Sequence, residues 1–463
     1  MRSIFAIAYI SMRSAFRSKV FLTVLTLLGL LIVGIPLTIK GDGTIAGYCR
    51  ILIDYTLNFV RAILAIATIW AGCASISQEV ENKSIQMTMS KPVNALQLWF
   101  GKWLGLMTPI FMLVILSGTI VYGILMWNVR PSQLSDTEQE ILRQEILVGR
   151  KDEEPREPEG MRERVDAMVK QALAGGSVPS NMSESELRRA ARRTFMRHRQ
   201  TCEPGQSCGW TFTLPARDEA KPITLEYRIA SSQIGGVSMS GEWIASNPDG
   251  EVLHREKTTV KTESENKHSI PGAVAAKGGE IVLVYKNLSQ DGTVIFPVDS
   301  SPKLLVYAGG FEMNFLRTLL IIFFQLALLG AIAITMGAFF STPVAAFVSI
   351  FALLLVFMNT YIHSMAQKRD YSPTPHHHGA PTEQRDNSPN PVDVFVHYVF
   401  VSLDTVMAPL KSANALQRCS TGRFVGWDLL GRVFLYRVLI YSGVLAAIAA
   451  LGFSRRELAL PQR

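Results

Sequence analysis

The chain has 463 residues, of which 48% are hydrophobic and 18% are charged, whereas roughly 25% of a typical soluble domain is charged. Its mean hydropathy is +0.21 and its formal net charge is +8. This composition excludes a disordered or fibrous protein and disfavours an ordinary soluble enzyme. Residues 129–312 hold 24 Lys and Arg and 27 Asp and Glu, which leaves 22 basic and 11 acidic residues elsewhere. The positive excess thus accompanies the apolar segments, which is typical of a membrane protein and not of a nucleic-acid-binding protein.

The N-terminal segment, residues 1–19, has a cluster of apolar residues ahead of Arg13, Arg17 and Lys19. This pattern is typical of an amphipathic helix that lies in the membrane interface before the first span. The apolar run that follows has about twenty residues, longer than the core of a signal peptide, and no small-x-small cleavage site precedes Gly41. We therefore predict that this segment is a cytoplasmic interfacial helix and not a cleaved signal.

Six stretches are apolar enough to be predicted as transmembrane helices. They cover residues 20–39, about 63–77, 104–126, 319–340, 344–363 and about 433–453. The second is short unless it begins near Leu57 and includes Arg61, and the sixth contains Arg437. An arginine inside a membrane is costly unless it pairs or reaches the headgroups. We predict that each arginine lies near a helix end and extends to the headgroup layer; whether the two line a pathway stays open.

Basic residues outside the spans indicate the orientation. With the N-terminus in the cytoplasm, residues 1–19, 78–102 and 454–463 are cytoplasmic and carry ten Lys and Arg and three acidic residues. The 364–432 segment on the other side carries seven basic and six acidic residues. The positive-inside rule therefore favours two cytoplasmic termini. We expect a multi-pass protein of the bacterial inner membrane, surrounded by lipid, with residues 128–312 outside the cytoplasm.

The first part of the predicted outer domain, residues 128–208, is rich in charge and helix formers, and we predict that it is helical. Ser183 and Glu186 have the spacing of a capping box. Six arginines at helical spacing fit either a site for an anionic headgroup or partner, or a solvated face paired with nearby acids. They are Arg188, Arg189, Arg192, Arg193, Arg197 and Arg199.

The second part, residues 209–312, contains short β-rich runs about ten residues apart, with Gly, Pro, Asn and Asp between them. This spacing predicts a small β-sandwich or jelly roll. Its aromatic residues fit either a sugar- or lipid-binding face or, more commonly, the core of the sandwich. The four concerned are Trp210, Tyr227, Trp243 and Tyr285.

The predicted fold class is a membrane all-α protein with six transmembrane helices and an extracytoplasmic α+β insertion between helices 3 and 4. The spans occupy 20–127, 313–363 and the first part of 433–463, which ends in a cytoplasmic tail. The 364–432 segment is predicted to be an outer loop with re-entrant or interfacial helices.

Cys202 and Cys208 lie in the outer domain, in the sequence CEPGQSC, where an oxidising compartment permits a disulfide. Zinc is the alternative for such spacing, but no second cysteine pair is nearby. Asn287 begins an Asn-Leu-Ser acceptor pattern for glycosylation, which is common by chance. Three consecutive histidines in a Pro-, Ser- and Asn-rich loop are weak candidates for a metal. They are His376, His377 and His378.

Motifs for nucleotide binding and hydrolysis are missing from the sequence. No GxxxxGK[ST] loop, HExxH or GxSxG occurs in the chain. We therefore expect a chain that is not an enzyme by itself and that binds no cofactor.

The most informative segment, about residues 78–100, follows the second span. From Ser77 to Val93 it has the sequence SQEVENKSIQMTMSKPV. It mixes apolar and charged residues, and its proline disfavours helix at the residue before it. We interpret it as a short amphipathic helix on the cytoplasmic side that a soluble partner could grip; the alternative is a plain interfacial loop. The candidate contact residues are Glu79, Glu81, Lys83, Ser84, Ile85, Met87, Met89, Lys91 and Pro92.

This pattern resembles that of ABC-2 type permeases, in particular those grouped with multi-copper enzyme maturation and gliding-motility systems. The basic segment that leads to Arg17-Ser18-Lys19-Val20-Phe21, the Gly101-Lys102 pair and the Phe340–Ala346 stretch are similar too. The resemblance covers the six spans. The chain departs from the family at Ser84, where Gly or Thr is frequent, and by the long insertion of residues 128–312.

The resemblance implies the membrane subunit of an ATP-driven ABC transporter, an exporter, that works with a second permease copy or a homologue. Two partner ATPase subunits would hold ATP and Mg. Glu79 and Glu81 would pair with basic residues of the ATPase, and the apolar contact would come from Ile85, Met87 and Met89.

The insertion has a parallel in lipopolysaccharide-transport permeases, which have a periplasmic β-jellyroll at the same point of the chain. This architectural analogy implies an outer domain that receives an amphiphile or further extracytoplasmic proteins. The alternative from another class is a non-transporting membrane sensor or scaffold whose outer domain binds a ligand. The sequence does not indicate the substrate.

Overall fold

The structure, a computed structural model, divides into two compact units. The first, called the bundle, comprises Met1–Ile146, Phe311–Thr421 and Val425–Arg463. The second, called the β unit, comprises Leu147–Gly310 and Gly422–Phe424. The residues described are 2–38, 44–81, 93–130, 135–175, 184–215, 221–232, 237–275, 278–290, 292–366, 391–407 and 415–455.

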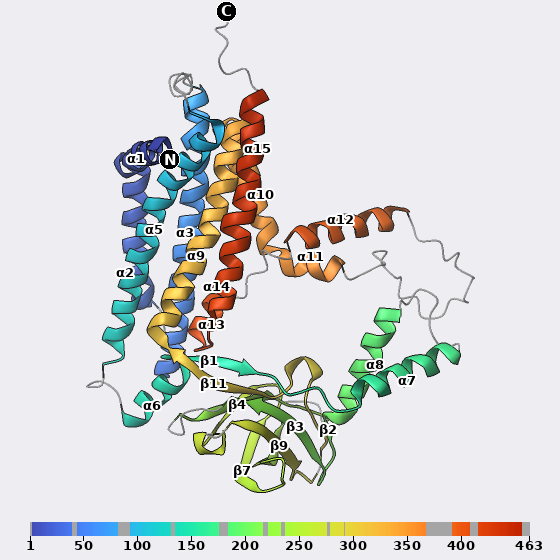
Figure 1. The fold of residues 1–463 in the computed structure, drawn as a ribbon. Helices are drawn as coiled ribbons and strands as arrows, with labels where there is room; N and C mark the ends of the chain where they lie inside the picture. The colour runs from blue at the N-terminus through green and yellow to red at the C-terminus, as the bar shows by residue number, and fades with distance from the viewer. Residues whose placement is uncertain are drawn as a thin grey trace, which may run out of the picture. The chain divides into compact units, whose positions relative to one another are not determined.

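The long helices of the bundle run side by side (Figure 1). In the described part of the chain, five helices are long and apolar enough to cross a membrane. At 1.5 Å per residue, each can cross the ~30 Å hydrocarbon core. They are α2 (Lys19–Thr38), α3 (Ile45–Glu81), α5 (Ala95–Asn128), α9 (Phe311–Phe339) and a continuous helix made of α14 (Trp427–Val433), the π-helical η5 (Phe434–Tyr441) and α15 (Ser442–Arg455).

The predicted second span, residues 63–77, is corrected by the structure to the 37-residue helix α3. Sequence hydropathy misses its first half because Arg50, Asp54 and Asn58 interrupt the apolar run. In the structure, these three residues share one face of α3, because they are four residues apart.

The fifth predicted span, residues 344–363, is not confirmed as a crossing. The structure divides it between α10 (Thr342–Phe357) and α11 (Asn359–Ala366). The 16 residues of α10 extend only about 24 Å, less than the hydrocarbon core. α10 packs against α3 and α9, and α11 packs against α12 (Pro391–Met407).

The N-terminal helix α1 (Arg2–Arg17) crosses α5 where α5 presents two glycines. A Cβ atom on Gly101 would lie 2.7 Å from Cβ of Ile7, and one on Gly105 would lie 2.7 Å from the Ala8 carbonyl oxygen. Side chains at these two positions would therefore push α1 away. The predicted N-terminal helix is thus present and docked on α5, and its place in a membrane interface stays a prediction.

Three spans end at the same end of the bundle as α1. The hydroxyl of Ser77 in α3 donates to the carbonyl oxygens of Gly337 and Phe340, each at 3.1 Å, where α9 ends. The ring of Phe339 lies against Gly452 of α15, where a Cβ atom would lie 2.2 Å away. The N-terminal helix and the adjoining ends of α3, α9 and α15 thus share one end. The side of a membrane that this end faces stays a prediction.

α9 packs against α3 through small residues. A Cβ atom on Gly72 would lie 2.7 Å from Cβ of Ala333, and one on Gly337 would lie 2.7 Å from the Cys73 carbonyl oxygen. Lipid tails are as apolar as leucine side chains, so helices in a membrane associate through such close contacts and not through hydrophobic burial. This packing makes α3 and α9 a closely fitted pair.

The β unit contains eleven strands in its described residues, with antiparallel pairing throughout the named strands. One four-stranded sheet has the order β1 (Val148–Glu153), β11 (Lys303–Gly310), β4 (Ile223–Arg228) and β8 (Glu265–Ile270). The other has the order β3 (Ser207–Leu214), β9 (Gly279–Asn287), β6 (Ser238–Ser246) and β7 (Val252–Lys261). A short sheet has the order β2 (Thr201–Cys202), β10 (Val294–Ile295) and β5 (Ala230–Ser231).

The predicted all-helical character of residues 128–208 is corrected in part. The structure has helices α6 (Asp136–Glu145), α7 (Met161–Ala174) and α8 (Glu184–Arg199) there, but it also has β1 and β2. β1 pairs with β11, which lies about 150 residues later in the chain. Such a short charged strand gives no local signal, because cross-strand packing decides its conformation. α6 belongs to the bundle and not to the β unit.

The two four-stranded sheets of the β unit enclose one aromatic core, so the unit is a β-sandwich. Phe296 is completely buried, and its ring centroid lies 4.7 Å from that of Trp210 and 5.2 Å from that of Tyr285. Tyr227 and Trp243 are buried beside it. The four aromatic residues named from the sequence thus form core, and the alternative of an exposed sugar- or lipid-binding face is wrong.

Cys202 and Cys208 are joined by a disulfide at the edge of this core. Asn287 is completely buried next to it, and its amide donates to the carbonyl oxygens of Cys202 (3.1 Å) and Gly292 (2.9 Å). A glycan needs an exposed amide, so Asn287 cannot carry one in the folded chain. The acceptor pattern is therefore a chance match.

Candidate functional site

The segment predicted to contact an ATPase begins at the end of α3. α3 continues to Glu81, so Glu79 and Glu81 belong to the last turn of a span and not to a separate helix. The carboxylate of Glu79 forms an ion pair with Lys102 of α5, and Lys102 also donates to the Ser75 carbonyl oxygen at 3.4 Å. Outside the described residues lie Lys83, Ser84, Ile85, Met87, Met89, Lys91 and Pro92, the side chain of Glu81, and His376, His377 and His378.

The ion pair changes the role expected for Glu79. Its carboxylate already has a cationic partner within the chain, so we no longer expect it to be a free anion for the ATPase. The pair instead joins the end of α3 to the first turns of α5, on either side of residues 82–92. The side chain of Lys102 is only 9% exposed, and removing one member of such a pair leaves an uncompensated buried charge.

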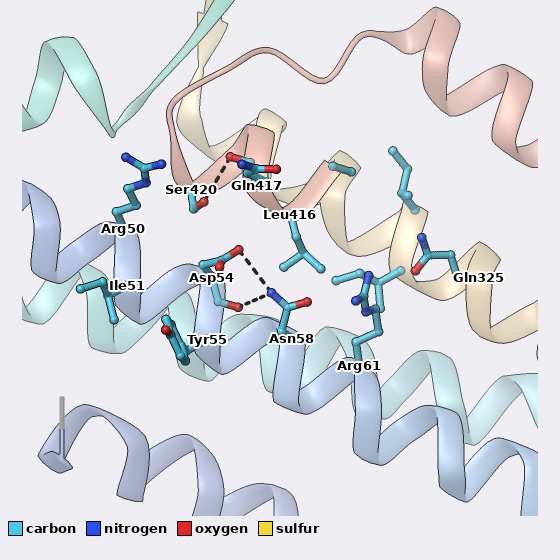
Figure 2. A pocket seen from close by; sticks show the side chains of 13 residues that line it. Arg50, Ile51, Asp54, Tyr55, Asn58, Arg61, Gln325, Leu416, Gln417 and Ser420 are labelled. Atoms are coloured by element: carbon cyan, nitrogen blue, oxygen red, sulfur yellow. Dashed lines mark hydrogen bonds between the residues drawn. The ribbon is translucent and has the colours of Figure 1, made fainter. Parts of the chain in front are cut away.

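A second candidate site is a polar pocket of 390 Å³ within the bundle, between α3, α9 and α13 (Ala415–Ser420) (Figure 2). Six residues of α3 line it, and four of them recur at spacings of four, four and three residues, which put them on one helix face. These four are Arg50, Asp54, Asn58 and Arg61. The rest of the lining consists of Ile51, Tyr55, Ile321, Ile322, Gln325, Ala415, Leu416, Gln417 and Ser420.

Hydrogen bonds order part of this pocket. The Asn58 amide donates to the backbone carbonyl of Asp54 at 2.8 Å and to its carboxylate at 3.2 Å. Figure 2 shows Asn58 pointing from α3 toward Leu416 of α13, and α13 also contributes the polar residues Gln417 and Ser420 to the lining. The lining therefore combines cations, one carboxylate and amides with aliphatic side chains.

The position of Arg61 along α3 gives the depth of the pocket. Arg61 lies 18 residues before Glu79, which corresponds to about 27 Å of helix. That length is close to the thickness of a hydrocarbon core. If the Glu79 end lies at one membrane surface, Arg61 lies at the opposite boundary. The pocket then lies in the headgroup layer farther from α1.

Arg437 lies at an equivalent depth, 18 residues before Arg455, and its charge interacts with that of Arg61. It belongs to η5, and π-helical turns are rare and frequently occur at functional sites. Arg437 is only 2% exposed. The prediction that Arg61 and Arg437 lie near helix ends is wrong, because both helices continue well past them. Whether the two arginines reach a headgroup layer stays a prediction.

Two arginines of α8 support the interpretation of a solvated face paired with nearby acids over that of a site for an anionic headgroup or partner. Arg188 forms an ion pair with Asp166 at 3.1 Å, and Arg192 forms one with Glu157 at 2.6 Å. These side chains are about half exposed. Arg188 and Arg192 therefore lie on a solvated face and are paired with nearby acids.

A charged cluster that the sequence did not reveal lies in the β unit. Arg423 donates to the Asp152 carboxylate at 3.0 Å and forms a second ion pair with Glu226. Residues 422–424 lie along β1, where the backbone N–H of Phe424 donates to the Arg150 carbonyl oxygen at 2.7 Å. Burial raises the pKa of Glu226, and the charge of Arg423 opposes this rise.

The polar pocket was also missed from the sequence, although a signal for it exists. Arg50, Asp54, Asn58 and Arg61 recur at helical spacing within an otherwise apolar stretch, a pattern that marks one polar face on a span. Among the described residues, no three His, Cys, Asp or Glu side chains are placed to hold a metal ion. Comparison of the chain with family models, curated proteins and solved structures finds no match.

Proposed function

We propose that this chain is the membrane-spanning permease subunit of an ATP-driven ABC transporter, an exporter, and that a separate subunit hydrolyses ATP. The observation that carries the proposal is the Glu79–Lys102 ion pair. It ties α3 and α5 together on either side of residues 82–92, the segment that resembles the ATPase-contacting element of ABC-2 permeases. A partner that grips this segment therefore moves two spans at once.

The packing between α3 and α9 supports a path for that movement. Gly72 contacts Ala333, and Gly337 contacts the backbone of Cys73, without room for a further methyl group. Closely packed helices shift as rigid bodies, so a movement of α3 displaces α9. Both helices line the polar pocket. ATP-driven movement at the α1 end would thus change the pocket at the other boundary.

The proposed assembly contains two ATPase subunits and a second permease copy or homologue, in an inner membrane with the α1 end in the cytoplasm. Ten Lys and Arg and three acidic residues on the segments at this end support the orientation. The exposed apolar side of α2, which includes Leu30 and Leu37, is suited to contact with lipid or with the second copy.

An exchange of the two charges tests the ion pair. We expect Glu79→Lys alone and Lys102→Glu alone each to lower ATP hydrolysis by the purified assembly roughly tenfold, since interaction energies of paired residues are about 0.5–3 kcal/mol. The double exchange should restore hydrolysis, because it re-forms the pair with reversed polarity. Glu81→Lys serves as the comparison: it should weaken copurification of the ATPase, and Lys102→Glu should not rescue it.

Two outcomes would count against the proposal in different ways. If the double exchange fails to restore hydrolysis, Glu79 acts on the partner and not on Lys102. If no ATPase copurifies with the wild-type chain, the transporter assignment is wrong, and the sensor or scaffold alternative with a ligand-binding β unit becomes the better account.

A further inference from the structure

The polar pocket between α3, α9 and α13 has the composition of a site for an anionic group. Arg50 and Arg61 line it and supply two cations. Asp54 is its one carboxylate among the lining residues described. Arginine presents a planar fork of N–H donors that suits phosphate oxygens. The excess of cations thus favours a phosphate group.

The other polar groups indicate that more than a bare phosphate is bound. Asp54 accepts hydrogen bonds, and the amides of Asn58, Gln325 and Gln417 can each donate or accept. The volume of 390 Å³ lies within the ~300–1,000 Å³ of small-ligand pockets, more than a single phosphate needs. A headgroup that carries hydroxyl or ammonium groups beside its phosphate would use both parts of the lining.

The apolar side of the pocket indicates where the rest of the ligand lies. Ile321, Ile322 and Leu416 are buried next to the polar groups. On the outer surface of α3, the side chains of Tyr55 and Phe59 are about half exposed at the same level. The pocket lies about one hydrocarbon thickness from the Glu79 end of α3, as its helical rise shows. A ligand with acyl chains could therefore keep them in the bilayer while its headgroup occupies the pocket.

We infer that this pocket binds the phosphate-bearing headgroup of a membrane amphiphile in the leaflet farther from α1. The guanidinium groups of Arg50 and Arg61 bind the phosphate, and Asp54 and Asn58 bind the hydroxyl or ammonium groups beside it. The amphiphile is the class of substrate that the transporter exports; that role rests on the proposed function, whereas the binding itself requires no ATPase.

The binding is tested on the full-length chain, purified in neutral detergent and incubated with defined lipids. Native mass spectrometry counts the molecules of phosphatidylglycerol retained per chain, and diacylglycerol, which lacks the phosphate, is the comparison lipid. We expect the wild type to retain phosphatidylglycerol and not diacylglycerol. The Arg50→Gln/Arg61→Gln variant should retain at least tenfold less phosphatidylglycerol per chain than the wild type.

Two further variants separate binding from folding. Arg432→Gln removes an exposed arginine of α14 that is paired with Asp428 at 3.0 Å, outside the pocket, and should leave lipid retention unchanged. Arg61→Lys keeps the charge without the fork and should retain an intermediate amount. Thermal unfolding of each variant in detergent shows that the bundle is intact.

The inference is overturned if the doubly substituted chain retains as much phosphatidylglycerol as the wild type, or if diacylglycerol is retained equally. Glycerol 1-phosphate, which has the same phosphate without acyl chains, is added as a soluble competitor. If it displaces the lipid at equal concentration, the ligand is a soluble phosphate compound and the amphiphile is ruled out. Copurification of an ATPase with the wild type is scored separately, so failure of the proposed function is distinguished from failure of this site.

Discussion

The bundle and the β unit are held together by different means. In the bundle, large apolar side chains such as Leu37, which is 81% exposed, lie on the outside, and the spans meet through Gly72, Gly337 and other small residues. In the β unit, the large aromatic side chains are buried around Phe296. Lipid solvates apolar side chains as well as a protein interior does, so the bundle depends on fit. Water solvates apolar side chains poorly, so the sandwich is stabilised by the burial of its apolar side chains.

The two units also use charge differently. The bundle holds its partly buried charges at its two ends, in the Glu79–Lys102 pair and in the polar pocket. The β unit holds its best-buried ion pairs at Arg423, where residues 422–424 join β1. Charges in the bundle therefore lie at the sites proposed for function, whereas the Arg423 cluster fastens two segments of one fold.

The largest effect is expected from Phe296→Ala in the β unit. The substitution empties the centre of the aromatic core, and such truncations cost about 3–5 kcal/mol. Hydrogen exchange measured by mass spectrometry on the full chain should show lost protection in β3 and β9 and unchanged protection in α3 and α9. Leu253→Ala, at a residue 40% exposed on β7, is the control and should change protection little. Equal loss in the bundle would show that the two units do not unfold separately.

The next largest effect is expected from Gly337→Val in the bundle. The new side chain would meet the backbone of Cys73, which cannot move aside without separating α3 from α9. Overpacking of this kind costs typically 1–3 kcal/mol, and we expect about 3 kcal/mol because the obstacle is backbone. The midpoint of thermal unfolding in detergent measures this loss of stability. Gly123→Val on α5, where a Cβ atom has no neighbour within 4 Å, should leave the midpoint unchanged; an equal drop would contradict the fitted packing.

A smaller effect is expected from Arg423→Met in the β unit. Removing the shared cation leaves the buried Glu226 beside the partly buried Asp152 without a cation between them. We expect a loss of about 2 kcal/mol, below the ~3–5 kcal/mol of fully buried pairs. Arg228→Met removes the exposed Arg228–Glu263 pair and should cost less than about 0.5 kcal/mol.

The loss in Arg423→Met should also depend on pH. The pKa of Glu226 is raised by burial, so a folded chain without Arg423 gains stability when this carboxyl takes up a proton. The deficit should therefore be greatest near pH 7 and should shrink as the pH falls toward about 4.3, the ordinary pKa of glutamate. This deficit in the free energy of unfolding is measured by urea unfolding at each pH, with hydrogen exchange of β1 and β4 as the readout. A deficit that does not vary with pH would show that the two carboxyls stay solvated.

Much of the fold could be predicted from the sequence, because apolar length and alternation are local properties. The long spans and most strands of the β unit, including β9 and β11, coincide with runs recognised from residue type alone. The aromatic residues around Phe296 were correctly assigned to the core, since large rings in alternating strands usually face inward. The predicted boundary at residue 209 between a helical and a β-rich part was wrong. β1 lies before that boundary, and its conformation depends on its partner strand β11.

The candidate sites were less predictable, because they depend on contacts between distant residues. Glu79 was singled out for its charge, yet its partner Lys102 lies on the next span and no spacing rule joins them. The polar pocket needs α13, which begins 334 residues after the end of α3 in the chain. Arg437 was noticed from its cost in a membrane, but its burial depends on the helices packed around it.

The central claim, that this chain is the permease of an ATP-driven transporter, is tested most directly by isolation of the tagged full-length chain from its native membrane. The account predicts that a protein with a GxxxxGK[ST] loop copurifies in a one-to-one ratio and that the assembly hydrolyses ATP. Hydrogen exchange on the same sample, with protected α3, α9 and β9, shows that the chain is folded. A folded chain that brings down no such ATPase would contradict the account.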